Sequence, residues 1–547
     1  MRARLVRFIP AVAAGLAVAV AIAGCAASAG TGSAGQARSP RPARAGSAPE
    51  AFVGSPAQVQ ALDKVLAYMT KHYQGLSQLA PGPVDIWDYG IGALWRKGID
   101  GAGTTVAVIE GWNDPDLAKD LHQYFHPLGM SDPDVTTIYP DGKLPATCPE
   151  GMVKLGSYGS CQGWQGELEL DVESVHLIAP YAHILVVVAP PDSEATDDAA
   201  SQVAPYEFMR AVEYVSTHHL ANVISISDGT GESTYSYGDN EITAQTPGEL
   251  TAAAAGIPFV DGTGDCGVVQ NLAVASSQCG DTTTFRGTAT WADSPWVTAV
   301  GGTTPAFSGT GVREGPDPVW HDGPFSPGAG YSAVFAKPAY QDAVNDKATR
   351  ELPDISLDAS NGTSEAGPLL AGVLALATQL NHGHDIGPVN PALYTILGPA
   401  GRRDGIVDVV SGNNDSLLRD GKMVTGYTAG PGYDVVSGWG TLSATAFVPA
   451  IVSAAALAAD GQARRQASAQ LAALEHGSIK LTAAGTGYTM TATGFLPRHP
   501  VRLFLNGSLT ATLTASPAGT VTGTIPPGRH TVTLTGMLIT ETATAAG

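Results

Sequence analysis

Four acidic residues lie close together in the stretch QGELELDVESVHLIAP, residues 165–180. Glu167 and Asp171 are four positions apart, and so are Glu169 and Glu173. Positions four apart share one side of a helix, so either pair could hold two carboxylates close together. Two carboxylates in a dry site cannot both ionise easily, and the pKa of one of them rises. Such a pair can accept a proton at acid pH, where a histidine base would already be charged.

The periodicity of this predicted helix separates the two pairs. At about 100° per residue, its apolar side chains share one face, formed by Leu168, Val172, Val175 and Ala179. Glu167 and Asp171 lie on the more apolar flank of that face, whereas Glu169 and Glu173 lie on the polar flank. We therefore expect the 167/171 pair to be partly buried and the 169/173 pair to form a solvated face.

A serine that could act with a carboxylate pair occurs in NGTSEAGPLLAGVLALATQL, residues 361–380. Ser364 begins an apolar helix of small residues. Its hydroxyl would lie near unpaired backbone N–H groups and the positive end of the helix dipole, which is a suitable position for a nucleophile. Alternatively, Ser364 is a plain helix cap, as most serines at helix starts are. The residues themselves leave both interpretations open.

The elements that must position these residues alternate between strands and helices. Apolar runs typical of buried strands occur at residues 103–112, 183–190, 222–229, 257–265 and 295–303, with helical patterns between them. This alternation predicts an α/β fold, a parallel sheet with helices on both faces. We place this body at residues 83–455, after a helical segment at 55–82.

The C-terminal part has a different period. An alanine-rich segment at 456–477 is predicted to be a helical connector. Residues 478–547 then alternate with a period of two between turn signals, as in YTMTATGF and RHTVTLTG. This pattern predicts a small antiparallel β domain, of an immunoglobulin-like sandwich type.

Composition limits the class of protein. The chain has 547 residues, of which 44% are apolar and 14% charged, so it has enough apolar surface for a folded core. Its formal net charge of -21 argues against a nucleic-acid partner, because phosphates would repel such a surface. The charge is consistent either with solubility or with life in acid, where many carboxylates are protonated.

The N-terminus predicts export. A basic MRARLVR is followed by the apolar run FIPAVAAGLAVAVAIAG. The sequence IAGC, Ile22 to Cys25, resembles the lipobox of bacterial lipoproteins. This resemblance implies a signal peptide at 1–24, a lipidated Cys25 and a flexible tether at 25–54, with the body extracytoplasmic and lipid-anchored to the outer face of the bacterial cell membrane. An uncleaved anchor helix is the alternative, and it also places the body outside the cytoplasm.

Four further cysteines occur, at positions 148, 161, 266 and 279. Outside the cytoplasm an even number favours disulfides, and four cysteines allow three pairings. We prefer the local pairs Cys148–Cys161 and Cys266–Cys279, because each closes a short polar loop. A zinc site is not expected, since no CxxC or HxxH pair occurs.

The segment around Ser364 resembles the nucleophile segment shared by subtilisin-like and sedolisin-like serine peptidases. A subtilisin-like enzyme would carry Asp at the end of its first strand and a His-Gly-Thr motif; here that strand ends in Glu110, and none of the 13 histidines begins such a motif. GELELD instead matches the sedolisin pattern Glu-x-x-x-Asp at Glu167 and Asp171. Further stretches resemble the family in the family order, namely FVDGTGDCG, SPWVTAVGGTT, GYSAVFAKPAYQ and LPDISLDA.

The resemblance to the sedolisin family covers most of residues 83–450 and implies a subtilisin-like fold and an acid-acting endopeptidase with a polypeptide substrate. It implies Ser364 as nucleophile, Glu167 as general base, Asp171 as its proton-sharing partner and Asp265 as a donor to the oxyanion. VDVVSGNN and AGPGYDVVSGWGTL resemble the family's calcium loop. One Ca²⁺ is therefore expected, with the ligand set Asp408, Val409, Gly430, Gly432 and Asp434. We expect a monomer; the alternative function is a sedolisin-fold lipoprotein that binds peptide or wall material without cutting it.

Overall fold

The structure is a computed structural model. It describes residues 53–72, 82–140, 142, 144, 147–148, 160–189, 205–235, 242–270, 272–273, 278–279, 286–307, 315–418, 420–457, 461–474, 477–495, 500–506, 508–516, 518–536 and 539–545. The predicted signal peptide and Cys25 lie outside the described residues, as does nearly all of the predicted tether.

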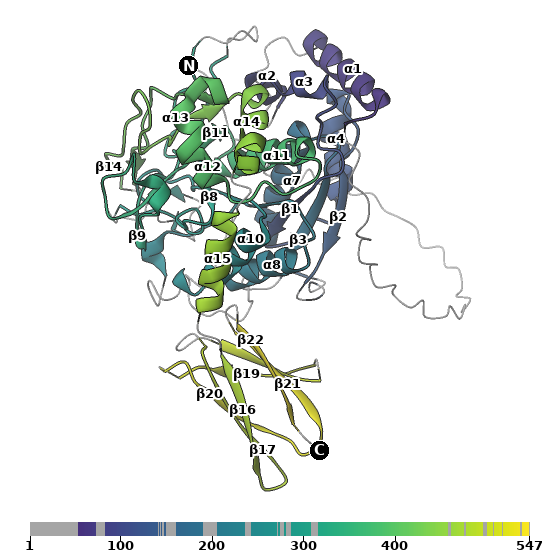
Figure 1. The fold of residues 1–547 in the computed structure, drawn as a ribbon, viewed down its shortest axis with the longest axis vertical. Helices are drawn as coiled ribbons and strands as arrows, with labels where there is room; N and C mark the ends of the chain where they lie inside the picture. Colours follow the sequence, from purple (N-terminus) through teal and green to yellow (C-terminus); the bar gives the residue numbers. More distant parts are fainter. Residues whose placement is uncertain are drawn as a thin grey trace, which may run out of the picture. The chain divides into compact units, whose positions relative to one another are not determined.

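Seven parallel strands form the central sheet, in the order β11-β8-β5-β4-β1-β3-β2 (Figure 1). Their bounds are β1 Thr105–Glu110, β2 Asp134–Ile138, β3 His183–Val188, β4 Val223–Ile226, β5 Phe259–Gly262, β8 Thr298–Thr303 and β11 Ile355–Asp358. The five strands predicted from apolar runs are confirmed as β1, β3, β4, β5 and β8. The remaining two, β2 and β11, are the edge strands.

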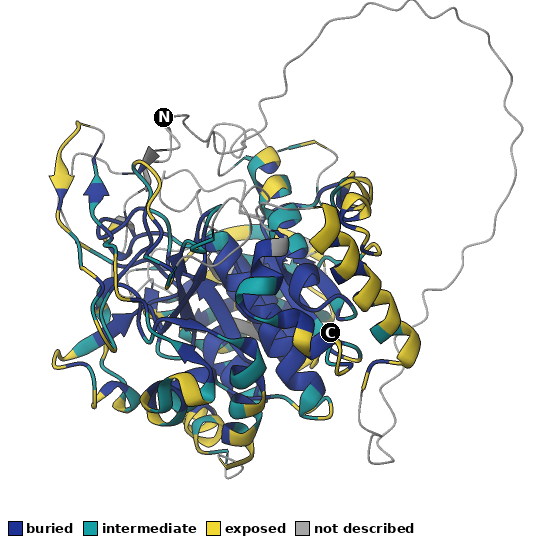
Figure 2. Cartoon of the chain, turned by 90° about the horizontal axis from the view of Figure 1, so that it is seen from above, coloured by how far each residue is buried: buried dark blue, intermediate teal, exposed yellow. Residues whose placement is uncertain are grey.

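Helices cover both faces of this sheet, as predicted. Val106 and Val108 of β1 share a core with α7 (Cys161–Ile178) and α11 (Thr363–Leu380). The alternate residues of β1 pack instead with α8 (Pro205–Thr217) and α10 (Thr246–Ala255). Such alternation follows from the two-residue period of a strand. Figure 2 shows the sheet and the helices against it as the buried centre of the molecule, with exposed residues on the outer helices.

The predicted N-terminal helical segment contains a long helix, α1 (Pro56–His72), and the short helices α2 (Pro83–Asp88) and α3 (Ile91–Trp95) follow it. α14 (Ala444–Leu457) packs against α11 and α3. The other elements of the body are α4 Leu117–Phe125, η2 His126–Leu128, η3 Glu232–Thr234, β6 Leu272–Ala273, β7 Gln278–Cys279, β9 Gly330–Ala336, η4 Ala339–Gln341, β10 Thr349–Leu352, α12 Val389–Ala392, η5 Leu393–Leu397, α13 Gly398–Ala400, η6 Gly401–Asp404, β12 Ile406–Val407, β13 Ser416–Leu417, β14 Met423–Val424 and β15 Thr441–Leu442.

Both preferred disulfides are confirmed. Cys148 is bonded to Cys161 at the start of α7, and Cys266 is bonded to Cys279. Each closes a segment with a sequence separation of 13. Cys161 lies six residues before Glu167, and Cys266 directly follows Asp265. The two bridges therefore restrain the segments that carry predicted site residues.

The predicted connector contains α15 (Gln462–Ala473), which packs on α10 through the buried Ala467. The C-terminal residues form two antiparallel sheets, β16-β17-β20 and β19-β18-β21-β22. Their bounds are β16 Ser478–Ala484, β17 Gly487–Thr493, β18 Pro500–Leu505, β19 Ser508–Thr514, β20 Val521–Ile525, β21 His530–Gly536 and β22 Ile539–Ala545. A common apolar core joins the two sheets, as expected for a sandwich.

Among the described helices, none is by itself long and apolar enough to span a membrane. α14 and α15 satisfy the length and composition criteria only as a pair, across a bend of 63°.

Candidate active site

Three strands of the sheet and two helices bring the predicted residues together at one edge. The carboxyl ends of parallel strands meet at the same edge of a sheet, where α/β proteins bind their ligands. β1 ends at Glu110 there, and the segments after β4 and β5 carry Ser227 and Asp265. α7 and α11 pack against each other, so Glu167 and Asp171 of α7 face the beginning of α11.

Ser364 is the second residue of α11, which begins after Gly362. The Ser364 side chain lies close enough to the Glu167 carboxyl to influence its pKa. Burial raises the pKa of Glu167 well above its usual value, and the neighbouring Asp171 raises it further. The neighbouring Ser364 hydroxyl acts in the opposite direction and lowers the pKa, because a donor stabilises the ionised carboxylate. The geometry therefore couples the serine directly to one member of the carboxylate pair.

Asp171 is fully buried behind Glu167. The Ser227 hydroxyl donates to Asp171 Oδ1 at 2.8 Å and also lies 3.1 Å from the Ser364 carbonyl oxygen. Burial raises the pKa of Asp171 to about 7, while hydrogen bonds from Ser227 and Glu110 lower it. Glu110 is itself buried, and burial and the nearby Asp171 raise its pKa well above normal. Glu110 is thus a third buried acidic group beside the Glu167–Asp171 pair.

Asp265 lies beside the segment that leads into Ser364. Its Oδ1 accepts hydrogen bonds from the Thr363 backbone N–H at 2.8 Å and from the Thr363 hydroxyl at 2.9 Å. A Cβ atom at Gly362 would lie 2.5 Å from Asp265 Oδ2, and Gly362 has a φ of +94°, so this position requires glycine. Burial raises the pKa of Asp265, while the hydrogen bonds from Thr363 act in the opposite direction. These contacts hold Asp265 next to Thr363, the residue that precedes Ser364.

The expectation of a solvated 169/173 face is wrong. Glu169 and Glu173 are both half-buried, and burial raises their pKa values to about 7 and about 8. Glu169 lies beside Asp114 and Asp120 at α4, and Glu173 acts on Glu365 of α11. α4 and α11 therefore cover a flank that the helical period alone left open to solvent.

Three residues that sequence reasoning did not assign to the site also lie in it: Glu110, Ser227 and Asp228. Asp228 has one buried oxygen without a hydrogen-bond partner among the described residues, and burial raises its pKa to about 7. Its charge acts on Glu167 and Glu110. Their positions in the sequence could have indicated them, because Glu110 lies at the end of one predicted parallel strand and Ser227 and Asp228 lie at the end of another.

The residues implied as calcium ligands come from two neighbouring loops. Asp408 Oδ2 accepts the Gly432 N–H at 2.9 Å, and Asp434 Oδ2 accepts the Gly430 N–H at 2.8 Å. Asp408 Oδ1 is buried and has no hydrogen-bond partner among the described residues. The described hydrogen bonds also leave the carbonyl of the buried Val409 unused. Two carboxylates and free carbonyl oxygens fit a hard cation such as Ca²⁺.

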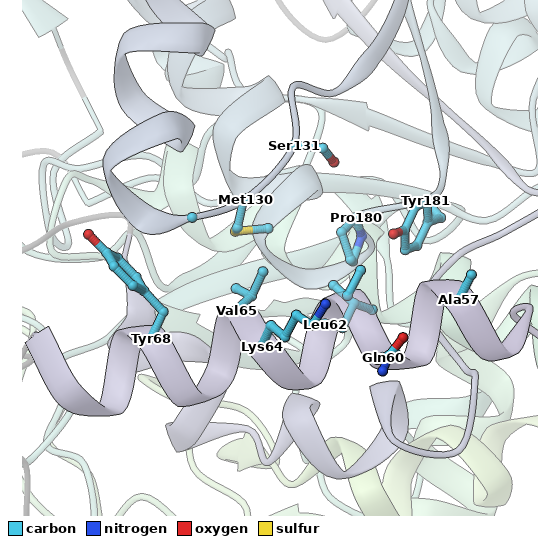
Figure 3. Close-up of a pocket in the computed structure, with 12 residues that line it drawn as sticks. Ala57, Gln60, Leu62, Lys64, Val65, Tyr68, Met130, Ser131, Pro180 and Tyr181 are labelled. Atoms are coloured by element: carbon cyan, nitrogen blue, oxygen red, sulfur yellow. The ribbon is translucent and has the colours of Figure 1, made fainter.

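A cavity of about 550 Å³ lies elsewhere, between α1 and the loops around Met130 and Tyr181 (Figure 3). None of the predicted site residues lines it.

Comparison with known proteins agrees with the resemblance to the sedolisin family. No family model matches the chain. Kumamolisin of Bacillus sp. (strain MN-32) is 30% identical over 377 residues, which cover 63% of this chain and 59% of kumamolisin. Sedolisin of Pseudomonas sp. (strain 101) is 29% identical over 365 residues, covering 62% of this chain and 56% of that protein. The chain thus spans less than two thirds of the length of either relative.

A solved structure resembles the body of this chain. Pseudomonas sedolisin, a serine-carboxyl proteinase complexed with two molecules of pseudo-iodotyrostatin, matches with a TM-score of 0.53 and 28% sequence identity. The match covers 65% of this chain and 94% of that one.

Proposed function

This chain belongs to the sedolisin family of serine-carboxyl peptidases, and from that premise we propose that it hydrolyses peptide bonds at acid pH through an acyl-enzyme on Ser364. The single observation that carries the proposal is the position of the Ser364 side chain beside the Glu167 carboxyl. It links the proposed nucleophile at the start of α11 to a carboxylate pair made of the half-buried Glu167 and the buried Asp171, the arrangement that acid-pH acyl transfer needs.

Glu167 acts as general base and then as general acid. As Ser364 Oγ attacks the carbonyl carbon of the substrate, its proton passes to the Glu167 carboxylate, and a tetrahedral intermediate forms. Glu167 then returns the proton to the leaving amine nitrogen, the C–N bond breaks and the acyl-enzyme remains. Water hydrolyses the acyl-enzyme by the same steps in reverse order, with Glu167 again taking and returning the proton.

Asp171 and Glu110 are neighbouring acidic groups that influence the protonation of Glu167. Ser227 donates a hydrogen bond to Asp171 and Glu110 lies beside it; both lower the pKa of Asp171, which burial raises to about 7. Asp171 in turn raises the pKa of Glu167, which makes Glu167 a better proton acceptor than an isolated glutamate in mild acid.

Asp265 stabilises the oxyanion. Its Oδ1 accepts two hydrogen bonds from Thr363, so that Oδ2, when it is protonated, can donate to the negative oxygen of the tetrahedral intermediate. Donors of this kind are typically worth about 10²–10³-fold in rate. Because Asp265 must be protonated for this role, the proposed activity belongs to acid pH.

The proposal also includes one bound calcium ion and a lipid anchor. Asp408, Val409, Gly430, Gly432 and Asp434 would hold one Ca²⁺, which supplies a structural tie between two loops and takes no part in proton transfer. Lipidation at Cys25 would hold the body at the outer face of the cell membrane, where polypeptides are its substrates.

The test is digestion of an unfolded protein by the full chain from pH 3 to 7. Wild type should cleave most rapidly in the acid part of this range. Ser364→Ala should lower the rate by at least about 10³-fold, because it removes the nucleophile. Ser468→Ala, on the exposed side of α15, is the matched control and should retain full activity.

Unchanged proteolysis by Ser364→Ala would refute the nucleophile assignment. Absence of cleavage by wild type at every pH would instead favour the alternative, a protein that binds peptide or wall material without cutting it.

A further inference from the structure

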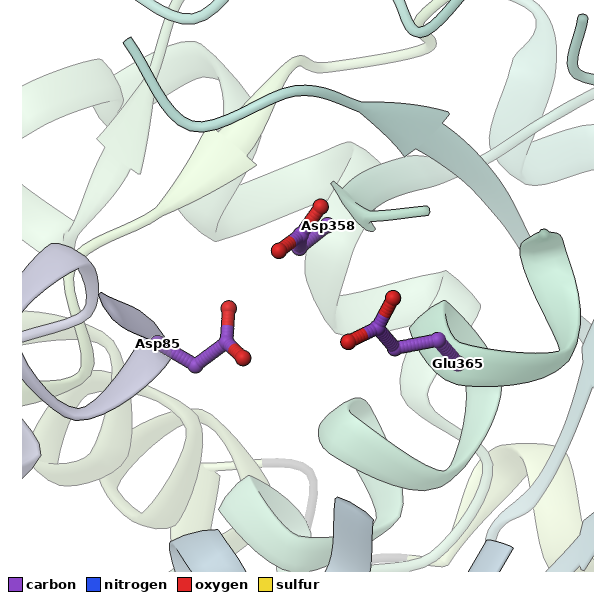
Figure 4. A group of neighbouring side chains, drawn as sticks. All are labelled: Asp85, Asp358 and Glu365. Carbon is purple, nitrogen blue, oxygen red and sulfur yellow. The ribbon is translucent and has the colours of Figure 1, made fainter. Parts of the chain in front are cut away.

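Three acidic side chains outside the proposed catalytic groups converge in the core. Asp85 comes from α2, Asp358 from the end of β11 and Glu365 from the first turn of α11 (Figure 4). One oxygen of each lies within 4.8 Å of the corresponding oxygens of the other two. All three side chains are buried, with at most 1% of each residue exposed.

In each of these side chains, one oxygen is held by hydrogen-bond donors from the protein. Asp85 Oδ2 accepts from Gly82 N at 3.2 Å, Asp358 Oδ1 from Ser360 N at 2.9 Å and Ser360 Oγ at 2.7 Å, and Glu365 Oε2 from Asn361 N at 2.9 Å and Asn361 Nδ2 at 3.3 Å. Donors of this kind favour the ionised form of a carboxyl group. They also fix the orientation of each carboxylate, and one oxygen of each side chain faces the other two residues (Figure 4).

Within the described residues, no group outside the cluster donates a hydrogen bond to these second oxygens. The remaining possible donor is a proton carried by one of the three carboxyl groups. Asp85 Oδ1, Asp358 Oδ2 and Glu365 Oε1 are buried and accept no hydrogen bond from any other described residue. None of the three side chains forms an ion pair within the described part of the chain. The charges that act on the group from neighbouring elements are acidic too, Glu173 of α7 and Asp317. The phenols of Tyr89 and Tyr124 also face it.

Buried like charges at this spacing need positive charge among them, because the interior does not screen their repulsion. A proton shared between Asp85 and Asp358, which lie close enough to hydrogen-bond, would neutralise one of the three charges and leave Glu365 Oε1 without a donor. A divalent cation would neutralise two charges and could contact one oxygen of each side chain.

We propose that Asp85, Asp358 and Glu365 bind one hard divalent cation, of the calcium or magnesium class. Their donor atoms are all carboxylate oxygens, which suit these ions and not the softer metals that prefer nitrogen or sulfur. This site is separate from the loop site of Asp408 and Asp434. It ties α2 and β11 to the first turn of α11, directly after Ser364.

The experiment measures bound metal in the full-length Asp408→Ala chain, in which the loop site is disabled and the cluster is intact. The protein is equilibrated with CaCl₂ or with MgCl₂ at pH 7.5, freed of unbound metal by gel filtration and analysed by elemental mass spectrometry. One equivalent of metal per chain is expected in one of the two arms, and that arm identifies the ion. The double variant Asp408→Ala/Glu365→Gln should lose it.

Absence of bound metal in Asp408→Ala in both arms would overturn the proposal, and so would retention of the full equivalent by the double variant. If the double variant does not fold, the melting temperature of Asp408→Ala decides: chelator should lower it, and an unchanged value would overturn the proposal. These readouts do not depend on peptidase activity, so they stand apart from the test of the proposed function.

Discussion

At the scale of single residues, α7 carries two acidic pairs of the same spacing in different surroundings. Glu167 and Asp171 lie against Ser364 and Ser227, whereas Glu169 lies beside Asp114 and Asp120 on the opposite flank. Burial raises the pKa of members of both pairs, so a raised pKa does not distinguish them. The contact with Ser364 does.

Replacing each glutamate by glutamine tests this difference. Glu167→Gln removes the group placed to accept the Ser364 proton, and loss of a general base typically costs about 10²–10⁴-fold in rate. Glu169→Gln should leave the rate within about threefold of wild type, because Glu169 is already neutral in acid when its pKa is about 7. The measurement is peptide cleavage near pH 4 by both purified variants.

Both glutamine variants keep the shape of the carboxyl group, so native circular dichroism is the control for folding. An equal loss of activity in the two variants, or a larger loss in Glu169→Gln, would show that the base has been assigned to the wrong flank of α7.

At the scale of elements, the site depends on loops that follow the strands and helices. Asp408 accepts a hydrogen bond from the Gly432 N–H, and Asp434 accepts one from the Gly430 N–H. The first of these bonds connects the two loops without any cation. A cation that binds only the folded protein would stabilise this connection by mass action.

Asp408→Ala should therefore lower the melting temperature measured in calcium, and chelator should have a smaller effect on this variant than on wild type. The expected loss is about 2–3 kcal/mol at a calcium concentration near one hundred times the dissociation constant. Asp420→Ala, at an exposed position of a nearby loop, is the matched control. An equal effect of chelator on wild type and Asp408→Ala would remove the loop site from the proposal.

At the scale of the whole molecule, the body buries many carboxyl groups without cationic partners. Glu249 of α10 is an example outside the proposed sites: it accepts a hydrogen bond from Ser294 Oγ, and burial raises its pKa to about 8. Asp228 behaves similarly, with a pKa raised to about 7. In the unfolded chain such groups ionise near pH 4.

Stability should consequently fall as the pH rises. Because the folded pKa of these groups lies above the unfolded one, their contribution is fully present below about pH 4 and is lost as pH rises through about 7 to 8. The urea midpoint should decrease between pH 4 and pH 8. Glu249→Gln should reduce this decrease, since a tenfold change in the acidity constant on folding corresponds to roughly 1.4 kcal/mol of stability. A midpoint that is constant or rises over this range would contradict the interpretation.

The sequence determined those features that depend on local pattern. Apolar runs predict the five inner strands because a buried parallel strand is apolar throughout, and the four-residue spacing of Glu167 and Asp171 places both on one side of α7. The edge strand β2 escaped prediction because its half-exposed residues form no apolar run. The two disulfides also follow from proximity along the chain.

Only the tertiary structure decided what surrounds each acidic residue. Glu173 is half-buried because α11, distant in sequence, packs against that flank of α7, and a helical period carries no information about such a neighbour. Likewise, Asp85, Asp358 and Glu365 come from three elements that meet only because they pack together. Burial and proximity between distant segments arise from long-range packing, and they set both the pKa of a carboxyl group and the atoms it can contact.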